Sequence, residues 1–187
     1  MSPTLLDIKK ELRAAMNGVA AKTLRESGLG YRLTFGVDLP RLQEIAAQFT
    51  PGHSLAQELW HEDIRECKML AVLLQPREQF FAEVAEIWIE SLLPAQAELA
   101  QLMCMHLVFR EPYAAEMAFR WMADERQMFQ LCGFLTLARL LMQGAQLSPT
   151  SEDEFRDQAQ TALSSDYLPL RKAAANALLH LDANRTH

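Results

Sequence analysis

Hydrophobic residues recur at helical spacing along almost the whole chain, and segment 55–74 shows the pattern most clearly. Leu55 and Leu59 lie four residues apart, and the second half of the segment repeats apolar residues at intervals of three, four and seven. This predicts one helix ending near Trp60 and a second starting near Asp63, whose carboxylate would cap it. Such a pair cannot bury its apolar face alone and needs similar neighbours, as in a helical repeat protein.

The same periodicity predicts helices through the rest of the chain. Their approximate ranges are 4–26, 39–49, 77–91, 95–109, 112–123, 126–143, 152–163 and 168–182. Helix 126–143 is apolar on more than one face, which predicts a central position. Ser151 is expected to cap helix 152–163. No run of alternating β-branched residues is present, so the predicted fold class is all-α.

A short pattern repeats in the second helix of successive pairs. Each copy begins with a large apolar residue (Ile64, Phe129 or Leu170), which is followed by a polar residue and then by mostly small residues at three-residue intervals. Small residues at this spacing allow neighbouring helices to approach closely, and the copy at Leu170 is similar to a HEAT repeat. We predict one repeat domain over 1–187, with an N-terminal helical cap of about 1–50.

Charge weighs against a generally basic nucleic-acid-binding protein, because the net charge of the 187-residue chain is −6. The charge is uneven, however, since residues 1–41 hold seven Lys/Arg against four Asp/Glu. This basic end fits either local binding of a phosphate backbone or an ordinary solvated helix.

The three cysteines, Cys67, Cys104 and Cys132, sit in apolar helical runs, and none forms a CxxC pair. Buried thiols in a reducing compartment are the expected explanation. No apolar run approaches the roughly 18 residues of a membrane span, so we expect a cytoplasmic protein without membrane association. No metal-ligand spacing and no phosphate-binding glycine loop is present, so we expect neither a metal nor a cofactor.

With these patterns, most of the chain resembles the AlkD-like DNA alkylation repair family, which is built from HEAT-like repeats. The resemblance rests on Phe35-Gly36-Val37-x-x-Pro40-x-Leu42, on Leu59-Trp60 followed by Ile64-Arg65-Glu66 and Leu70-Ala71, and on Lys172-Ala173-Ala174-Ala175-Asn176-Ala177-Leu178. It implies a right-handed α-solenoid, an α-α superhelix of HEAT-like repeats.

Active members of that family excise positively charged alkylated purines from DNA without flipping the base into a pocket. The family's chemistry is assigned to two tryptophans, an aspartate and an arginine on the concave face. Aromatic faces attract a cation, and a carboxylate stabilises the oxocarbenium ion that develops at the sugar.

This chain departs from the family at each catalytic position. The resemblance places the last tryptophan at Asn176, the Trp-x-x-x-Asp segment at about Ala97 to Gln101, and the arginine at Gln130 or Leu131. None of these positions holds the family's residue. The resemblance therefore implies a DNA-associated protein whose base excision by the known route is weak or absent.

The tryptophans of this chain, Trp60, Trp88 and Trp121, lie elsewhere in apolar surroundings, and we expect them in the core. A surviving glycosylase would need another acid in place of the missing aspartate. Glu98 is the residue that we name for that role.

A DNA-binding surface would contact phosphates without reading sequence. The predicted contacts are Arg32, Arg41, Arg65, Lys68, Arg171 and Lys172. For Arg65 and Arg171 the alternative is structural, because arginines of HEAT repeats tie adjacent helices through an acid or a carbonyl.

The predicted partner is duplex DNA, damaged or unusual in shape. The alternative function is a HEAT-like scaffold for protein–protein interaction, which the acidic balance and the missing catalytic residues favour.

Overall fold

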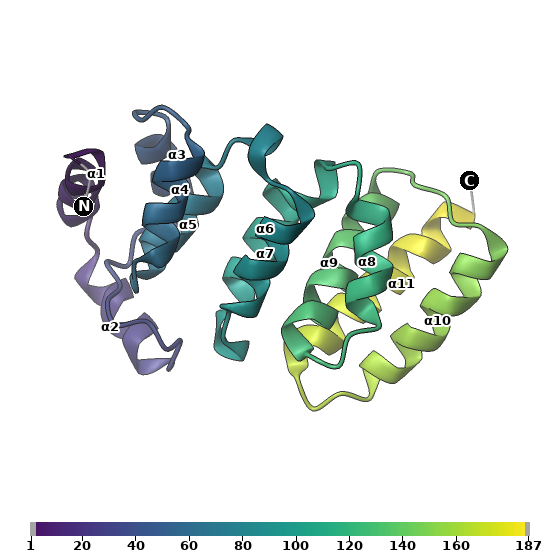
Figure 1. Ribbon diagram of the computed structural model, residues 1–187. Coiled ribbons are helices and arrows are strands. Elements are labelled where there is room, and N and C mark those ends of the chain that lie inside the picture. The colour runs from purple at the N-terminus through teal and green to yellow at the C-terminus, as the bar shows by residue number, and fades with distance from the viewer. Residues whose placement is uncertain (1–2, 186–187) are drawn as a thin grey trace. The chain divides into compact units, whose positions relative to one another are not determined.

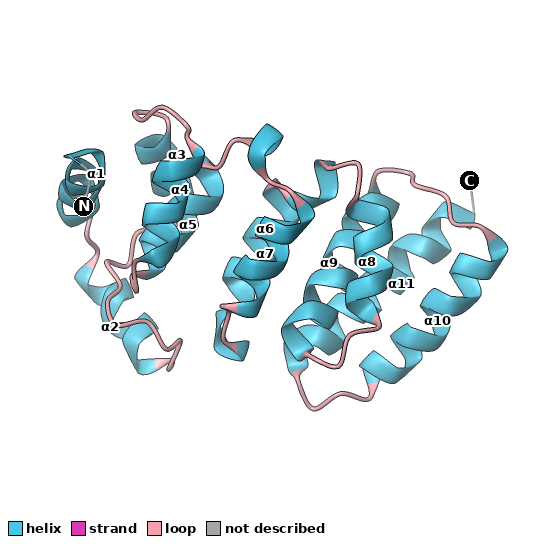
Figure 2. Cartoon of the chain, viewed as in Figure 1, coloured by secondary structure: helices cyan, strands magenta, loops and turns pink. Residues whose placement is uncertain are grey.

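The computed structural model describes residues 3–185, and all regular elements in this range are helices (Figures 1 and 2). The α-helices are α1 Pro3–Ala14, α2 Gly18–Glu26, α3 Leu39–Ala46, α4 His53–His61, α5 Arg65–Leu74, α6 Ala82–Glu90, α7 Ala97–His106, α8 Ala114–Met122, α9 Gln127–Met142, α10 Pro149–Leu163 and α11 Leu168–Arg185. Three short 3-10 helices are η1 Arg77–Gln79, η2 Pro94–Gln96 and η3 Val108–Arg110. The predicted all-α class is confirmed.

The chain divides into two compact units, Met1–Phe80 and Phe81–His187. Helices α1 to α5 belong to the first unit and α6 to α11 to the second. A single domain over 1–187 with a cap of about 1–50 stays a prediction.

In the first unit, α4 and α5 form the predicted helix pair, with α3 packed on α5 and α1 on α4. The prediction that Asp63 caps the second helix is wrong. Helix α5 begins after Ile64, whose backbone is extended, and no side chain caps the helix. A parallel bridge joins Ile64 to Leu33, and the Arg65 N–H donates to the Leu33 carbonyl at 3.2 Å. The loop backbone thus replaces the Asp63 carboxylate as acceptor for the start of the helix.

The single helix predicted over 4–26 is interrupted. Asn17 has an extended backbone and caps α2, since its side-chain oxygen accepts from the Ala20 N–H at 3.1 Å. The Asn17 N–H donates instead to the Phe35 carbonyl at 2.9 Å. Asn17 followed by Gly18 is a strong signal for a helix start, and the continuing apolar periodicity concealed it.

The predicted cap of helix 152–163 is also displaced. Helix α10 starts at Pro149, and Ser148 caps it by accepting from the Ser151 N–H at 3.1 Å. Proline suits the first helical position because it has no N–H to satisfy there. Ser151 therefore lies inside the first turn.

In the second unit α9 is central, as predicted, and packs against α7, α8 and α11, while α10 packs against α11. Gly133 of α9 faces α8 so closely that a Cβ atom would lie 2.7 Å from the Ala118 carbonyl oxygen and 2.7 Å from the Met122 nitrogen. The repeated small position thus allows two helix backbones to meet, as the sequence pattern indicated.

The three tryptophans lie in the cores of the two units. Trp60 lies in the first unit, Trp88 and Trp121 lie in the second, and all three are buried, which confirms the prediction. The indole N–H of Trp121 donates to the Glu86 carboxylate at 3.1 Å. Within residues 3–185, no helix has both the length and the apolar composition needed to cross a membrane.

Candidate nucleic-acid interface

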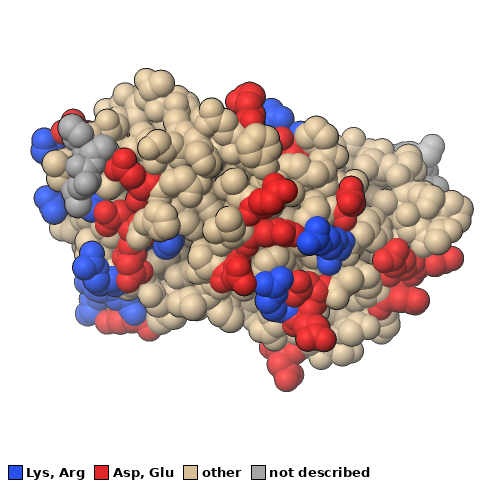
Figure 3. Space-filling view, in the orientation of Figure 1, with Lys and Arg blue, Asp and Glu red and all other residues tan. Residues whose placement is uncertain are grey.

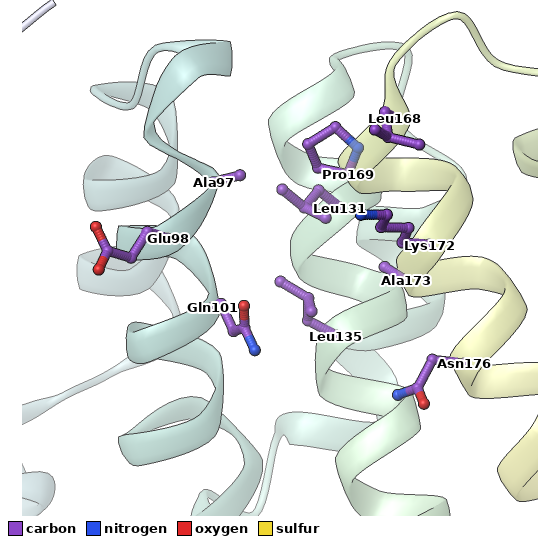
Figure 4. Close-up of a pocket in the computed structure, with 10 residues that line it drawn as sticks. All are labelled: Ala97, Glu98, Gln101, Leu131, Leu135, Leu168, Pro169, Lys172, Ala173 and Asn176. Carbon is purple, nitrogen blue, oxygen red and sulfur yellow. The ribbon is translucent and has the colours of Figure 1, made fainter. Parts of the chain in front are cut away.

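A groove of about 580 Å³ opens between α7, α9 and α11 of the second unit (Figure 4). Each helix presents one face to the groove, through side chains three or four residues apart. The lining residues are Ala97, Glu98 and Gln101 of α7, Leu131 and Leu135 of α9, and Leu168, Pro169, Lys172, Ala173 and Asn176 of α11.

The polar side chains of this groove are two neutral amides, an ammonium and a carboxylate on an apolar floor. In Figure 4 the ammonium of Lys172 points toward Leu131, and the Gln101 amide points into the space between the helices. The Glu98 carboxylate points away from the other lining residues. The groove therefore offers positive charge and hydrogen-bonding amides, with no carboxylate directed at its centre.

The positions that the family resemblance identified meet in this groove. Ala97, Gln101, Leu131 and Asn176 all line it, although they come from three helices. Gln130, the alternative to Leu131, faces elsewhere, since its amide donates to the Asp124 carbonyl at 2.7 Å and it lines a separate cavity of about 450 Å³. Leu131 is thus the α9 residue at the expected site.

The groove continues into a small hollow of about 60 Å³ along the same helices. It adds two basic side chains that sequence reasoning missed, Arg139 of α9 and His180 of α11. The Arg139 guanidinium lies 5.0 Å from the ring centroid of Phe109. The sequence spacing could have identified both residues. Arg139 lies four residues after Leu135 and His180 lies four residues after Asn176, so each shares a helix face with a residue that lines the groove.

Two of the predicted phosphate contacts, Arg65 and Arg171, form hydrogen bonds within the protein. Arg65 is buried, and its guanidinium donates to the Val37 carbonyl at 3.1 Å and to Glu66 at 3.2 Å. Arg171 is half-buried and donates to the Ser165 carbonyl at 2.7 Å. Both bonds are of the kind that the structural alternative expects, and burial leaves the Arg65 guanidinium little surface for a phosphate.

The other predicted contacts differ in how far they reach solvent. Lys68 is half-buried, its ammonium donates to the Trp60 carbonyl, and burial lowers its pKa. Arg41 is exposed and paired with Glu44 at 2.5 Å. Arg32 of the first unit and Lys172 of the second are exposed. Lys172 is the predicted contact that also lines the groove.

Several of the other charged side chains of the second unit pair with one another. Arg126 pairs with Asp124 at 2.8 Å and with Glu90 at 3.2 Å, and Arg120 approaches Glu86 at 3.7 Å. On the face of this unit drawn in Figure 3, acidic and basic side chains are interspersed. That face shows no extended basic surface. The groove is the candidate interface because it brings exposed Lys172 together with the positions that the family resemblance identified.

The helix pairs, the small residues between them and the groove define an all-α protein of HEAT-like repeats. The structure is similar to a solved structure described as "a new family of proteins related to the HEAT-like repeat DNA glycosylases with affinity for branched DNA structures". The likeness has a TM-score of 0.78, with 18% identity, over 96% of this chain and 76% of that chain, and it shows the shared fold. No curated protein matches significantly.

The family model described as DNA alkylation repair enzyme matches residues 8–181. The chain therefore belongs to the DNA alkylation repair enzyme family, as its sequence motifs predicted.

Proposed function

We propose that the protein binds DNA through the groove between α7, α9 and α11, and that its base excision by the family's known route is weak or absent. The observation that carries the proposal is the set of side chains at the expected catalytic positions. Ala97, Gln101, Leu131 and Asn176 line one groove but supply neither an aromatic face nor a carboxylate. A cationic purine would lack both stabilising groups there.

Lys172 in the same groove supports phosphate binding over capture of a cationic base. Its ammonium attracts a phosphate and repels a positively charged purine. The Glu98 carboxylate, the substitute acid, points away from the other lining residues, which weighs against a glycosylase that uses it.

The described affinity of the structural relative for branched DNA supports the same class of partner for this chain. We propose DNA of unusual shape, alongside damaged duplex, as its partner. We also propose a cytoplasmic location, for which the three free and buried cysteines are the support.

The decisive experiment measures release of N3- and N7-methylpurines from methylated duplex DNA, with binding of the same duplex followed in parallel. We expect binding at low salt and no release above the rate without protein. Lys172→Gln should weaken binding and lower the slope of log affinity against log salt by about 1. Arg120→Gln, which removes one positive charge from an exposed side chain of α8 outside the groove, is the control.

Release of methylpurines would overturn the non-catalytic part of the proposal, and its loss in Glu98→Gln would assign the chemistry to Glu98. Absence of binding at low salt would overturn the DNA-binding part.

The second candidate function is a protein-interaction scaffold. The observation that favours it is the apolar share of the groove, where Ala97, Leu131, Leu135, Leu168, Pro169 and Ala173 are six of the ten lining residues. If the protein neither releases methylpurines nor binds DNA, the protein-interaction scaffold becomes the proposed function.

A further inference from the structure

Leu168 is an exposed leucine at the edge of the groove, where α11 begins (Figure 4). Its exposed fraction is 48%, and Pro169 follows it directly and also lines the groove. Single exposed leucines are common on proteins and need no function. Leu168 differs in how firmly the structure holds it and in the charge beside it.

Hydrogen bonds fix the backbone next to Leu168. The Tyr167 hydroxyl donates to the Pro94 carbonyl, and the Tyr167 N–H donates to the Ser165 hydroxyl at 3.2 Å. The Arg171 guanidinium donates to the Ser165 carbonyl at 2.7 Å, which closes the turn from the helix side. Pro169 further restricts the backbone. An apolar side chain is thus presented on a rigid support.

The cation beside Leu168 makes this edge suitable for DNA. Lys172 lies one helical turn after Leu168 on α11, is exposed, and directs its ammonium into the groove. Within residues 3–185 no ion pair to Lys172 is found. Asp166, two residues before Leu168, is exposed and opposes this charge, so Asp166→Asn should strengthen DNA binding.

We propose that Leu168 is an apolar wedge that inserts where the base stack of DNA is already broken, at a branch point or an unpaired nucleotide, while Lys172 contacts the neighbouring phosphate. The inference rests on the proposed function. Apolar side chains that enter between bases must separate them, and this separation costs free energy in a continuous duplex. At a branch the stack is interrupted beforehand, so the wedge gains contact at lower cost. Leu168 would therefore determine preference for DNA shape.

The test compares affinities for a four-way junction and for a continuous duplex of the same sequence. Leu168→Ala should lower junction affinity more than duplex affinity, which reduces the junction-to-duplex affinity ratio by roughly tenfold. Leu168→Met, which keeps an apolar side chain, should retain most of the ratio. Leu179→Ala is the matched control, because Leu179 is an exposed leucine of the same helix that does not line the groove.

A direct readout of insertion is the fluorescence of 2-aminopurine in the base pair that flanks the branch point, because this base is still stacked on one side and its fluorescence rises when that stacking is lost. We expect a rise on binding of the unaltered protein and of Leu179→Ala, and no rise with Leu168→Ala. Circular dichroism of each variant checks that it is folded.

The outcomes separate this inference from the proposed function. If the unaltered protein binds DNA but shows no junction preference, or if Leu168→Ala keeps that preference, the wedge is overturned and DNA binding stands. If the unaltered protein binds neither the four-way junction nor the duplex at low salt, the proposed function fails and the wedge fails with it.

Discussion

Replacing Gly36 with alanine should destabilise the first unit by about 3–4 kcal/mol. Gly36 has φ +72°, a backbone conformation that disfavours side chains. A Cβ atom there would also lie 2.4 Å from the Ala21 nitrogen and 2.5 Å from the Asn17 carbonyl oxygen. Both neighbours are backbone atoms at the start of α2, so a rotamer change cannot relieve the overlap. The loss is measured by urea unfolding followed by circular dichroism.

Gly28→Ala is the control that separates conformational strain from overlap. Gly28 has nearly the same φ, +71°, and no heavy atom within 4 Å of its Cβ position. We expect a loss of about 1–2 kcal/mol for this variant, from strain alone. Equal losses at Gly28 and Gly36 would contradict the close approach to α2.

The second large effect is expected for Glu66→Ala, with a loss of about 3–5 kcal/mol. The fully buried carboxylate accepts from the Thr34 hydroxyl at 2.9 Å and from the N–H groups of Phe35 and Gly36 at 3.0 and 2.9 Å. It also pairs with buried Arg65 at 3.2 Å. Alanine would leave the guanidinium without its counter-charge and the Phe35 N–H without its acceptor, while the Gly36 N–H would keep only the Thr34 hydroxyl at 3.3 Å.

Glu44→Ala is the matched control, because Glu44 is exposed and pairs with exposed Arg41. Removing such a surface pair changes stability by about 1 kcal/mol or less. Glu66→Gln should fall between the two, since one amide oxygen accepts while the NH2 group faces N–H donors. Similar unfolding midpoints for Glu66→Ala and Glu44→Ala would show that the buried network contributes little.

Gly36 and Glu66 belong to two sequence motifs that were recognised separately and that the structure joins. The segment Phe35-Gly36-Val37 and the segment Ile64-Arg65-Glu66 were recognised separately, and in the structure the second holds the first through Glu66 and Arg65. Helical periodicity indicates which face is buried. It carries no information about which backbone N–H groups a distant carboxylate accepts.

The helix ends show a similar limit. Apolar spacing continues across the break before Asn17, so periodicity alone predicted one helix where the structure has two. The cap before α5 was missed because its acceptor is a carbonyl of Leu33. Backbone partners from another segment leave no mark in the local sequence.

The family resemblance pointed to positions that meet in one groove, apart from Gln130, but it did not give the full set of residues that line it. The resemblance located Ala97, Gln101 and Asn176, which do share one groove. Arg139 and His180 were missed, because their place beside it depends on how α7, α9 and α11 pack. Once that packing is known, the four-residue spacing along α9 and α11 assigns them to the same face.

The buried thiols give each unit its own chemical reporter. Cys67 belongs to the first unit, Cys104 and Cys132 belong to the second, and none is accessible to solvent. Burial raises the pKa of Cys67 to about 12 and also raises that of Cys132, so the reactive thiolate is suppressed. A thiol-labelling reagent would therefore modify each cysteine only when its surroundings open. The order of labelling would show which half of the chain opens first.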